Sequence, residues 1–155
     1  MACVVLRIIL GALYAAMAVG QLASWQAMPD VLGAYQGVPN EMLPWFAAAL
    51  IGAEFVAGAW FLALPRSQML APVWIYTAVA VVWTVLGAQA YARGLAVDNC
   101  GCFGVYLTQR LTWFTLVQDG LLLLYAALMI RGGLRARATQ PMTLISQPAK
   151  ETAGA

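Results

Sequence analysis

The sequence predicts an all-α integral membrane protein, built as an antiparallel four-helix bundle. Of the 155 residues, 63% are hydrophobic and 9% are charged, whereas a soluble domain carries about 25% charged residues. The apolar residues also fall into four runs, each close to the ~20 residues that a membrane-spanning helix needs. We therefore expect a transmembrane domain over residues 1–132, with helices at about 2–25, 45–64, 72–92 and 112–131.

The charge and residue counts argue against several functions. The net charge is +2, and the basic residues are scattered except near the C-terminal end, so we expect no nucleic-acid partner. The chain contains no histidine, which argues against haem ligation and histidine acid–base catalysis by this subunit alone.

The first apolar run, residues 2–25, is interpreted as a transmembrane helix that only Arg7 interrupts. A cleaved signal peptide is the alternative, because small residues near Ala23 resemble a cleavage site. Small and polar residues recur on this run at spacings of three and four, which places them on one face that should point into the bundle. Arg7 could instead reach the membrane interface. The residues of this stripe are Arg7, Gly11, Tyr14, Ala18 and Gln21.

The second helix follows a loop at 28–44 that has room for one short interfacial helix. Pro44 suits the first turn of the second helix, which ends before Pro65. Glu54 lies near the centre of this helix, and a carboxylate at that depth marks a functional site by default. The alternative is a protonated or paired carboxyl that fixes helix packing.

The third helix ends at Arg93-Gly94, and the fourth carries Asp119. At about 1.5 Å per residue, Asp119 lies about 10 Å inside the start of its helix and Glu54 about 14 Å inside the start of its own. Both helices start on the same side of the membrane, so the two carboxyls should lie at similar depth. The tail, residues 133–155, is polar, and we expect it to be disordered and cytoplasmic.

Residues 98–104, between helices three and four, hold the one sequence feature that can carry chemistry. Cys100 and Cys102 are separated only by Gly101. A disulfide between them encloses almost no chain, so it would stabilise little. It should also be bent and therefore easily reduced. Glycine is the residue best able to adopt the backbone angles of so small a ring. The pair therefore suits cycling between dithiol and disulfide.

Two other interpretations of the pair stay open. The cysteines could be idle thiols in a tight turn. They could also bind metal: zinc wants four ligands and the chain has no histidine, but two thiolates with a methionine could hold Cu(I). We assign no metal site.

The distribution of lysine and arginine predicts the orientation. The loop between helices one and two has neither residue, so both termini should be cytoplasmic in a bacterial inner membrane. The cysteine loop should then be outside, in the oxidising compartment, although Arg93 and Arg110 argue against it. Cys3 would lie at the opposite face, as a small buried apolar residue. The basic residues on the cytoplasmic side are Arg66, Arg131, Arg135, Arg137 and Lys150.

These residues together resemble the MauE/DoxX-like family of small four-helix bacterial membrane proteins, over about residues 7–130. The MauE branch is associated with maturation of methylamine dehydrogenase, whose small subunit is rich in disulfides. The DoxX branch includes a small subunit of a thiosulfate:quinone oxidoreductase. The Cys-Gly-Cys loop favours the MauE branch. The matching positions are Asn99-Cys100-Gly101-Cys102-Phe103-Gly104, Arg93-Gly94, Trp113 and Asp119, and more loosely Arg7, Gly11, Pro44 and Glu54.

We therefore expect a thiol–disulfide redox or maturation protein that acts on an extracytoplasmic thiol protein. The enzyme class that fits this expectation is a thiol–disulfide oxidoreductase. Cys100 and Cys102 would exchange disulfides with this partner, with Cys100 as the more exposed nucleophile. Arg93 or Arg110 could stabilise the attacking thiolate.

Electrons that enter the membrane would pass to a quinone near the outer ends of the helices, with Glu54 or Asp119 handling protons. The compartment and the family resemblance, rather than a motif, lead to this expectation. The alternative function is a non-catalytic accessory subunit on a larger respiratory or photosynthetic membrane complex. Small size, the lack of cofactor ligands and six tryptophans favour that alternative.

Overall fold

The computed structural model describes residues 2–67 and 69–138, with the side chains of residues 2, 3 and 136–138 left out, and has no β-strand in these ranges. Four of its helices are long and apolar enough to span a membrane, which confirms the predicted fold class. Three short helices, η1, α2 and η2, connect α1 to α3. The elements are α1 (Ala2–Ala23), η1 (Trp25–Ala27), α2 (Met28–Gly33), η2 (Asn40–Met42), α3 (Leu43–Ala63), α4 (Ala71–Ala92) and α5 (Trp113–Ala138).

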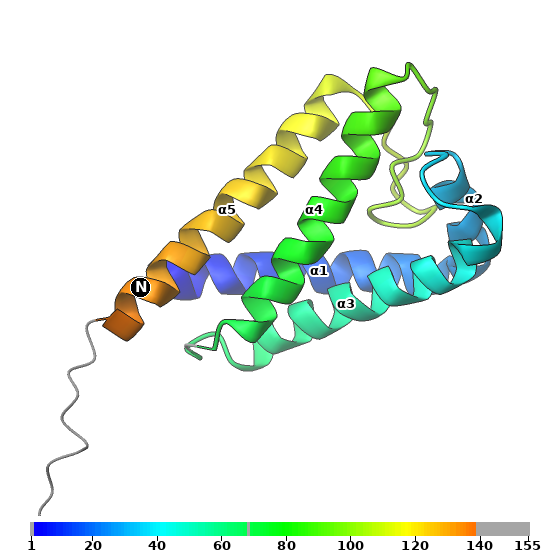
Figure 1. The fold of residues 1–155 in the computed structure, drawn as a ribbon. Helices are drawn as coiled ribbons and strands as arrows, with labels where there is room; N and C mark the ends of the chain where they lie inside the picture. Colours follow the sequence, from blue (N-terminus) through cyan, green and yellow to red (C-terminus); the bar gives the residue numbers. More distant parts are fainter. Residues whose placement is uncertain (1, 68, 139–155) are drawn as a thin grey trace, which may run out of the picture.

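The long helices form two antiparallel pairs arranged as a wedge (Figure 1). α1 runs beside α3, and α4 runs beside α5. The pairs approach each other where α1 starts and α5 ends, and they diverge at the opposite end. α2 and the segment 93–112 fill the open end of the wedge, so this segment has protein on several sides.

Small residues allow α1 and α3 to pack closely. A Cβ on Gly58 would lie 2.7 Å from the backbone nitrogen of Ala15, and a Cβ on Gly11 would lie 2.9 Å from Cβ of Phe61. Backbones approach in this way in membranes because packing, rather than water exclusion, drives helix association there.

The polar stripe of α1 faces the bundle, as predicted, because all five of its residues are buried. Arg7 is only 7% exposed, and its guanidinium donates to the carbonyls of Ser67 and Met69 in the α3–α4 turn. It also lies 5.6 Å from the centre of the Phe61 ring. Of the two interpretations of Arg7, the structure favours the buried one.

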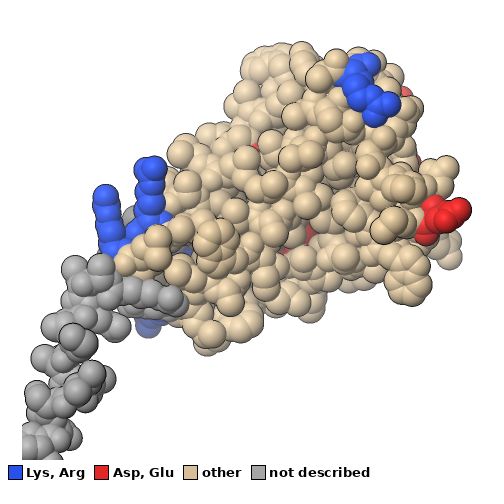
Figure 2. Space-filling view, in the orientation of Figure 1, with Lys and Arg blue, Asp and Glu red and all other residues tan. Residues whose placement is uncertain are grey.

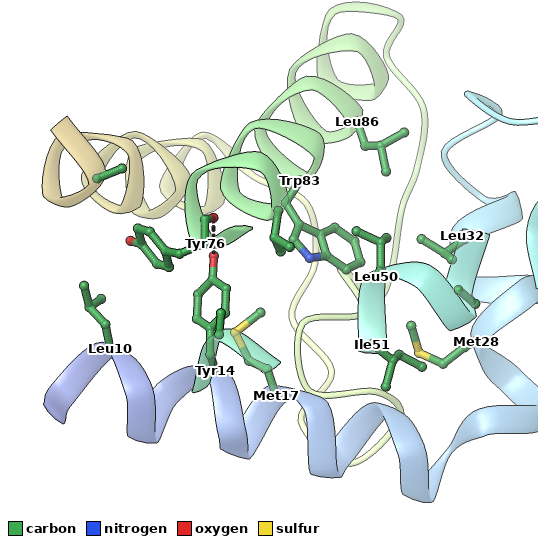
Figure 3. Close-up of a cluster of buried hydrophobic side chains, with 14 of the residues drawn as sticks. Leu10, Tyr14, Met17, Met28, Leu32, Leu50, Ile51, Tyr76, Trp83 and Leu86 are labelled. Atoms are coloured by element: carbon green, nitrogen blue, oxygen red, sulfur yellow. Dashed lines mark hydrogen bonds between the residues drawn. The ribbon is translucent and has the colours of Figure 1, made fainter. Parts of the chain in front are cut away.

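Aromatic side chains from three helices meet in the core, and Figure 3 shows Tyr14 of α1 and Tyr76 of α4 with the hydrogen bond between them. Tyr14 of α1 donates to the carbonyl of Tyr76 in α4 at 3.4 Å, and Tyr76 donates to the carbonyl of Leu122 in α5 at 2.8 Å. An unpaired polar group in this setting would cost several kcal/mol. The bond from Tyr14 therefore connects the two helix pairs across the wedge, and the bond from Tyr76 joins α4 to α5 within one pair.

One segment differs from the sequence expectation. α5 continues to Ala138, beyond the expected end near residue 132, because leucine, alanine and arginine favour helix and basic side chains suit a helix C-terminus. Residues 133–138 of the expected disordered tail are therefore helical, and residues 139–155 lie outside the described part. The loop at 28–44 contains the short helix α2, whose Met28 and Leu32 are buried in the core.

Candidate functional site

The cysteine loop folds back into the wedge instead of standing at the outer end of the bundle, which corrects the predicted position. A Cβ on Gly101 would lie 3.5 Å from the indole of Trp83. Trp83 precedes the last residue of α4, Ala92, by nine residues, which corresponds to about 14 Å along the helix. The loop thus leaves the end of α4, descends beside it and returns to start α5 (Figure 1).

Hydrogen bonds within the loop satisfy much of its backbone. The backbone nitrogen of Cys100 donates to the carbonyl of Gln109 at 2.7 Å, which joins the two arms of the loop. The Asn99 side chain accepts from the nitrogen of Gly101 at 3.0 Å and donates to the carbonyl of Gly104 at 2.9 Å. Irregular backbone at membrane depth is tolerated when protein groups pair with it in this way.

Three side chains from the α1–α3 half of the molecule hold the loop in place. The Tyr35 hydroxyl donates to the carbonyl of Cys100 at 2.9 Å. The amide Nε2 of Gln21 donates to the carbonyl of Cys102 at 3.2 Å. Farther along the loop, Oγ of Ser24 accepts from the nitrogen of Val105 at 3.3 Å. Both cysteine carbonyls are therefore fixed by residues distant in the sequence.

Two glycines allow the chain to turn here. Gly101 has φ of +79° and Gly104 has φ of +63°, in the left-handed region that side chains disfavour. This agrees with the predicted role of Gly101. A Cβ on Gly104 would also collide with Oγ of Ser24, at 2.0 Å. A Cβ on Gly101 would likewise lie 2.7 Å from Cγ1 of Val31. Both positions therefore require glycine for space as well as for backbone conformation.

The two cysteines are free thiols whose sulfurs lie 3.2 Å apart. When Cys100 ionises, the thiol of Cys102 donates to it, and this lowers the pKa of Cys100. The same interaction, with burial, raises the pKa of Cys102. Cys100 is thus the better thiolate, but it is only 2% exposed, while Cys102 is partly exposed. The expectation that Cys100 is the more exposed thiol is wrong.

The two arginines expected to stabilise the thiolate make other contacts. Arg93 donates to the backbone carbonyl and side-chain oxygen of Gln36, and to the side chain of Gln89. Arg110 pairs with Asp98 at 3.2 Å, with both side chains 80% exposed. Neither arginine is a cause of the lowered pKa of Cys100, which comes first from Cys102. Arg110 instead pairs with Asp98 across the loop, and Arg93 connects the end of α4 to the segment after α2.

The intramembrane carboxyls both face the bundle and lie close to the loop. Glu54 is fully buried, and its Oε1 accepts from the indole nitrogen of Trp83 at 2.7 Å. Asp119 is 7% exposed, and its Oδ2 lies 3.4 Å from where a Cβ on Gly87 would be. Trp83, which contacts Gly101, therefore connects Glu54 to the cysteine loop.

A mainly apolar cavity of about 220 Å³ lies beside Cys102 and Asp119. Helices α1, α4 and α5 and the loop all contribute to its wall. Cys102 and not Cys100 opens onto it. In the described part of the chain, no three histidine, cysteine, aspartate or glutamate side chains come together in a way that could hold a metal ion. The lining residues are Leu13, Met17, Trp83, Cys102, Phe103, Gln109, Thr115, Gln118, Asp119, Leu121, Leu122 and Tyr125.

Comparison with known families agrees with this architecture. A family model described as methylamine utilisation protein MauE matches residues 1–132. The chain belongs to the MauE family. The match confirms the MauE resemblance, and it includes the four apolar helices, the cysteine loop and both intramembrane carboxyls. Comparisons of this MauE-family chain with curated proteins and with solved structures gave no match.

Three residues that bind or contact the loop were not identified as site residues from the sequence. The sequence places Gln21 on the bundle-facing stripe of α1, but it does not indicate the hydrogen bond to the Cys102 carbonyl. Tyr35 and Trp83 carried no signal, because an aromatic residue in an apolar chain is ordinary core material. The polar group of a buried tyrosine or tryptophan usually finds a hydrogen-bond partner. Here those partners are the Cys100 carbonyl and Glu54.

Proposed function

We propose that this MauE-family protein is a membrane thiol–disulfide oxidoreductase whose redox centre is the Cys100–Cys102 pair. The observation that carries the proposal is the pair itself, two thiols whose sulfurs lie 3.2 Å apart. Their interaction lowers the pKa of Cys100 and raises the pKa of Cys102. A disulfide bond is about 2.05 Å long, so the two sulfurs need to move by only about an ångström to close one.

Exchange with a partner disulfide needs two steps. The Cys100 thiolate attacks one partner sulfur, which forms a mixed disulfide and releases a partner thiolate. Cys102 then loses its proton and attacks the Cys100 sulfur, which closes the Cys100–Cys102 bond and releases the second partner thiolate. Two electrons have then passed from the pair to the partner. The same steps in reverse oxidise a partner dithiol.

The other redox partner is proposed to be a quinone, acting as a substrate in the cavity beside Cys102. An apolar cavity with a few polar groups suits a ring of this kind. Oxidation of the pair by a quinone gives a disulfide and a hydroquinone, with two electrons and two protons transferred. Asp119 is the carboxyl among the lining residues and would hold a proton there.

The proposed location is a bacterial inner membrane with both termini in the cytoplasm. Figure 2 shows basic side chains beside the end of α5, with acidic and basic side chains at the opposite end of the molecule. Arg66, Arg131 and Arg135 are exposed at the α5 end, as the positive-inside rule favours for the cytoplasmic side. The cysteine loop would then be reached from the extracytoplasmic side, where proteins that acquire disulfides are found.

Single-cysteine variants in a Cys3→Ser background test this function. Cys102→Ser should trap a mixed disulfide with the partner, because the resolving thiol is gone, and Cys100→Ser should abolish it. The adducts are read on non-reducing gels after rapid acid quench. Full activity of both variants in cells, with no adduct from either, would contradict the proposal.

An accessory-subunit role is the second candidate, favoured by large exposed aromatics. Trp45 is 79% exposed and Trp113 is 66% exposed. Both side chains suit either lipid or a neighbouring subunit. Co-purification of a larger complex that survives mutation of both cysteines and fails in a Trp45→Ala, Trp113→Ala variant would favour this candidate over the redox one.

A further inference from the structure

Glu54 is a fully buried carboxyl with an incomplete set of partners. Its Oε1 accepts from Trp83, but its Oε2 has no hydrogen-bond partner. No ion pair among the described residues includes it. An isolated carboxylate is very costly in such surroundings and takes up a proton unless it is paired.

Gln21, like Glu54, has a buried oxygen without a hydrogen-bond partner. Its Nε2 donates to the carbonyl of Cys102, while its Oε1 is buried without a partner. The Gln21 side chain lies within hydrogen-bonding reach of the Glu54 carboxyl. Two neighbouring side chains thus each carry a buried acceptor oxygen with no donor, and a hydrogen atom on Oε2 of Glu54 would supply the donor that the Gln21 oxygen lacks.

We propose that Glu54 is a neutral carboxylic acid that donates its hydrogen to Gln21 and so positions the Cys-Gly-Cys loop. The chain of bonds runs from the Trp83 indole to Glu54, from Glu54 to Gln21, and from Gln21 to the Cys102 carbonyl. Trp83 also packs against Gly101. Through Trp83 and Gln21, Glu54 therefore supports the loop at both Gly101 and Cys102. An ionised Glu54 would attract the N–H groups of Gln21 and weaken the bond to Cys102.

Glu54 is therefore a positioning residue, and its protonation state is directly measurable. Infrared spectra of the full-length protein in lipid nanodiscs should contain the carbonyl band of a buried protonated carboxyl. This band should be lost in Glu54→Gln and kept in Asp119→Asn and in Glu41→Gln, a control at an exposed carboxyl. Spectra of the parent and Glu54→Gln that differ only in carboxylate bands would overturn the proposal.

Thiol labelling tests the effect on the loop, in a Cys3→Ser background with the pair reduced. Glu54→Gln keeps a neutral group that can donate to Gln21 and accept from Trp83, so labelling should stay within about twofold of the parent. Glu54→Ala and Gln21→Ala each remove the connection and should speed labelling about fivefold to tenfold. Acceleration in Glu54→Gln equal to that in Glu54→Ala, or none in either alanine variant, would contradict the positioning role.

This inference does not depend on the proposed redox function. Its readouts are the protonation of one carboxyl and the exposure of two thiols, and neither requires turnover. If the mixed disulfide is never trapped but the infrared band and the labelling order are found, the redox proposal fails and the positioning role stands.

Discussion

Substituting Gly104 with alanine should release the cysteine loop from the bundle, and Gly94 provides a matched control. Both glycines have left-handed backbone angles, with φ of +63° and +66°. A Cβ on Gly94 would meet nothing within 4 Å. A Cβ on Gly104 would lie 2.0 Å from Oγ of Ser24 and 2.5 Å from the carbonyl oxygen of Gly20. The two variants therefore share the backbone strain and differ in the collision.

The size of the difference follows from these contacts. The left-handed conformation costs alanine about 1–2 kcal/mol in both variants. At Gly104, Ser24 must also move, which breaks its bond to Val105 at a cost of about 0.5–1.5 kcal/mol. Overpacking against Gly20 adds about 1–3 kcal/mol. The loop should thus be destabilised by roughly 2–4 kcal/mol more in Gly104→Ala, which raises the undocked population about 30-fold to 1,000-fold.

Maleimide labelling of Cys100 measures this population, because the residue is 2% exposed and reacts mainly when the loop opens. The assay uses reduced protein in membranes in a Cys3→Ser, Cys102→Ser background, with circular dichroism to check helix content. Gly104→Ala should label at least tenfold faster than Gly94→Ala. Equal rates in the two variants, with helix content unchanged, would refute the docking geometry.

Three further predictions use the same protein. Tyr35→Phe removes one hydrogen bond to the Cys100 carbonyl, of about 1 kcal/mol, so Cys100 labelling should rise about fivefold; an unchanged rate would mean that this bond does not hold the loop. Because the Cys102 thiol lowers the pKa of Cys100, Cys102→Ala should move the pH midpoint of Cys100 labelling upward by removing this donor; a midpoint that stays in place would contradict that cause. Cysteine probes at Asn40 and Arg66 should react from opposite sides of the membrane, the first from outside; labelling of both from one side would exclude the four-span topology.

The sequence was sufficient for the features that depend on local pattern. Four long apolar runs in a chain with 9% charged residues leave few alternatives to four spanning helices. The spacing of Arg7, Gly11, Tyr14, Ala18 and Gln21 identified the buried face of α1, because residues three and four apart share a helix face. Glu54 and Asp119 were expected inside the bundle because a carboxyl facing lipid would be too costly.

The position of the cysteine loop could not be predicted, because it depends on contacts between residues far apart in the sequence. Tyr35 and Gln21 bind the carbonyls of Cys100 and Cys102 over separations of 65 and 81 residues. Periodicity and propensity carry no information on such pairs. The expectation for Arg93 and Arg110 failed for the same reason, since proximity in sequence to the thiols did not imply a contact in space.

In the docked loop, the thiol with the lower pKa is not the thiol that is accessible. This difference explains how one pair could serve two different partners. Cys100 has the lower pKa but is buried, whereas Cys102 opens onto the cavity within the bundle. Under the proposed redox function, a small apolar oxidant in the cavity would approach Cys102 while the loop stays docked. A protein partner would need Cys100, whose exposure requires the bonds from Tyr35 and Gln21 to break first. The two exchanges would then be separated in space and in loop conformation, because the contacts that hide Cys100 from a protein are the ones that hold Cys102 at the cavity.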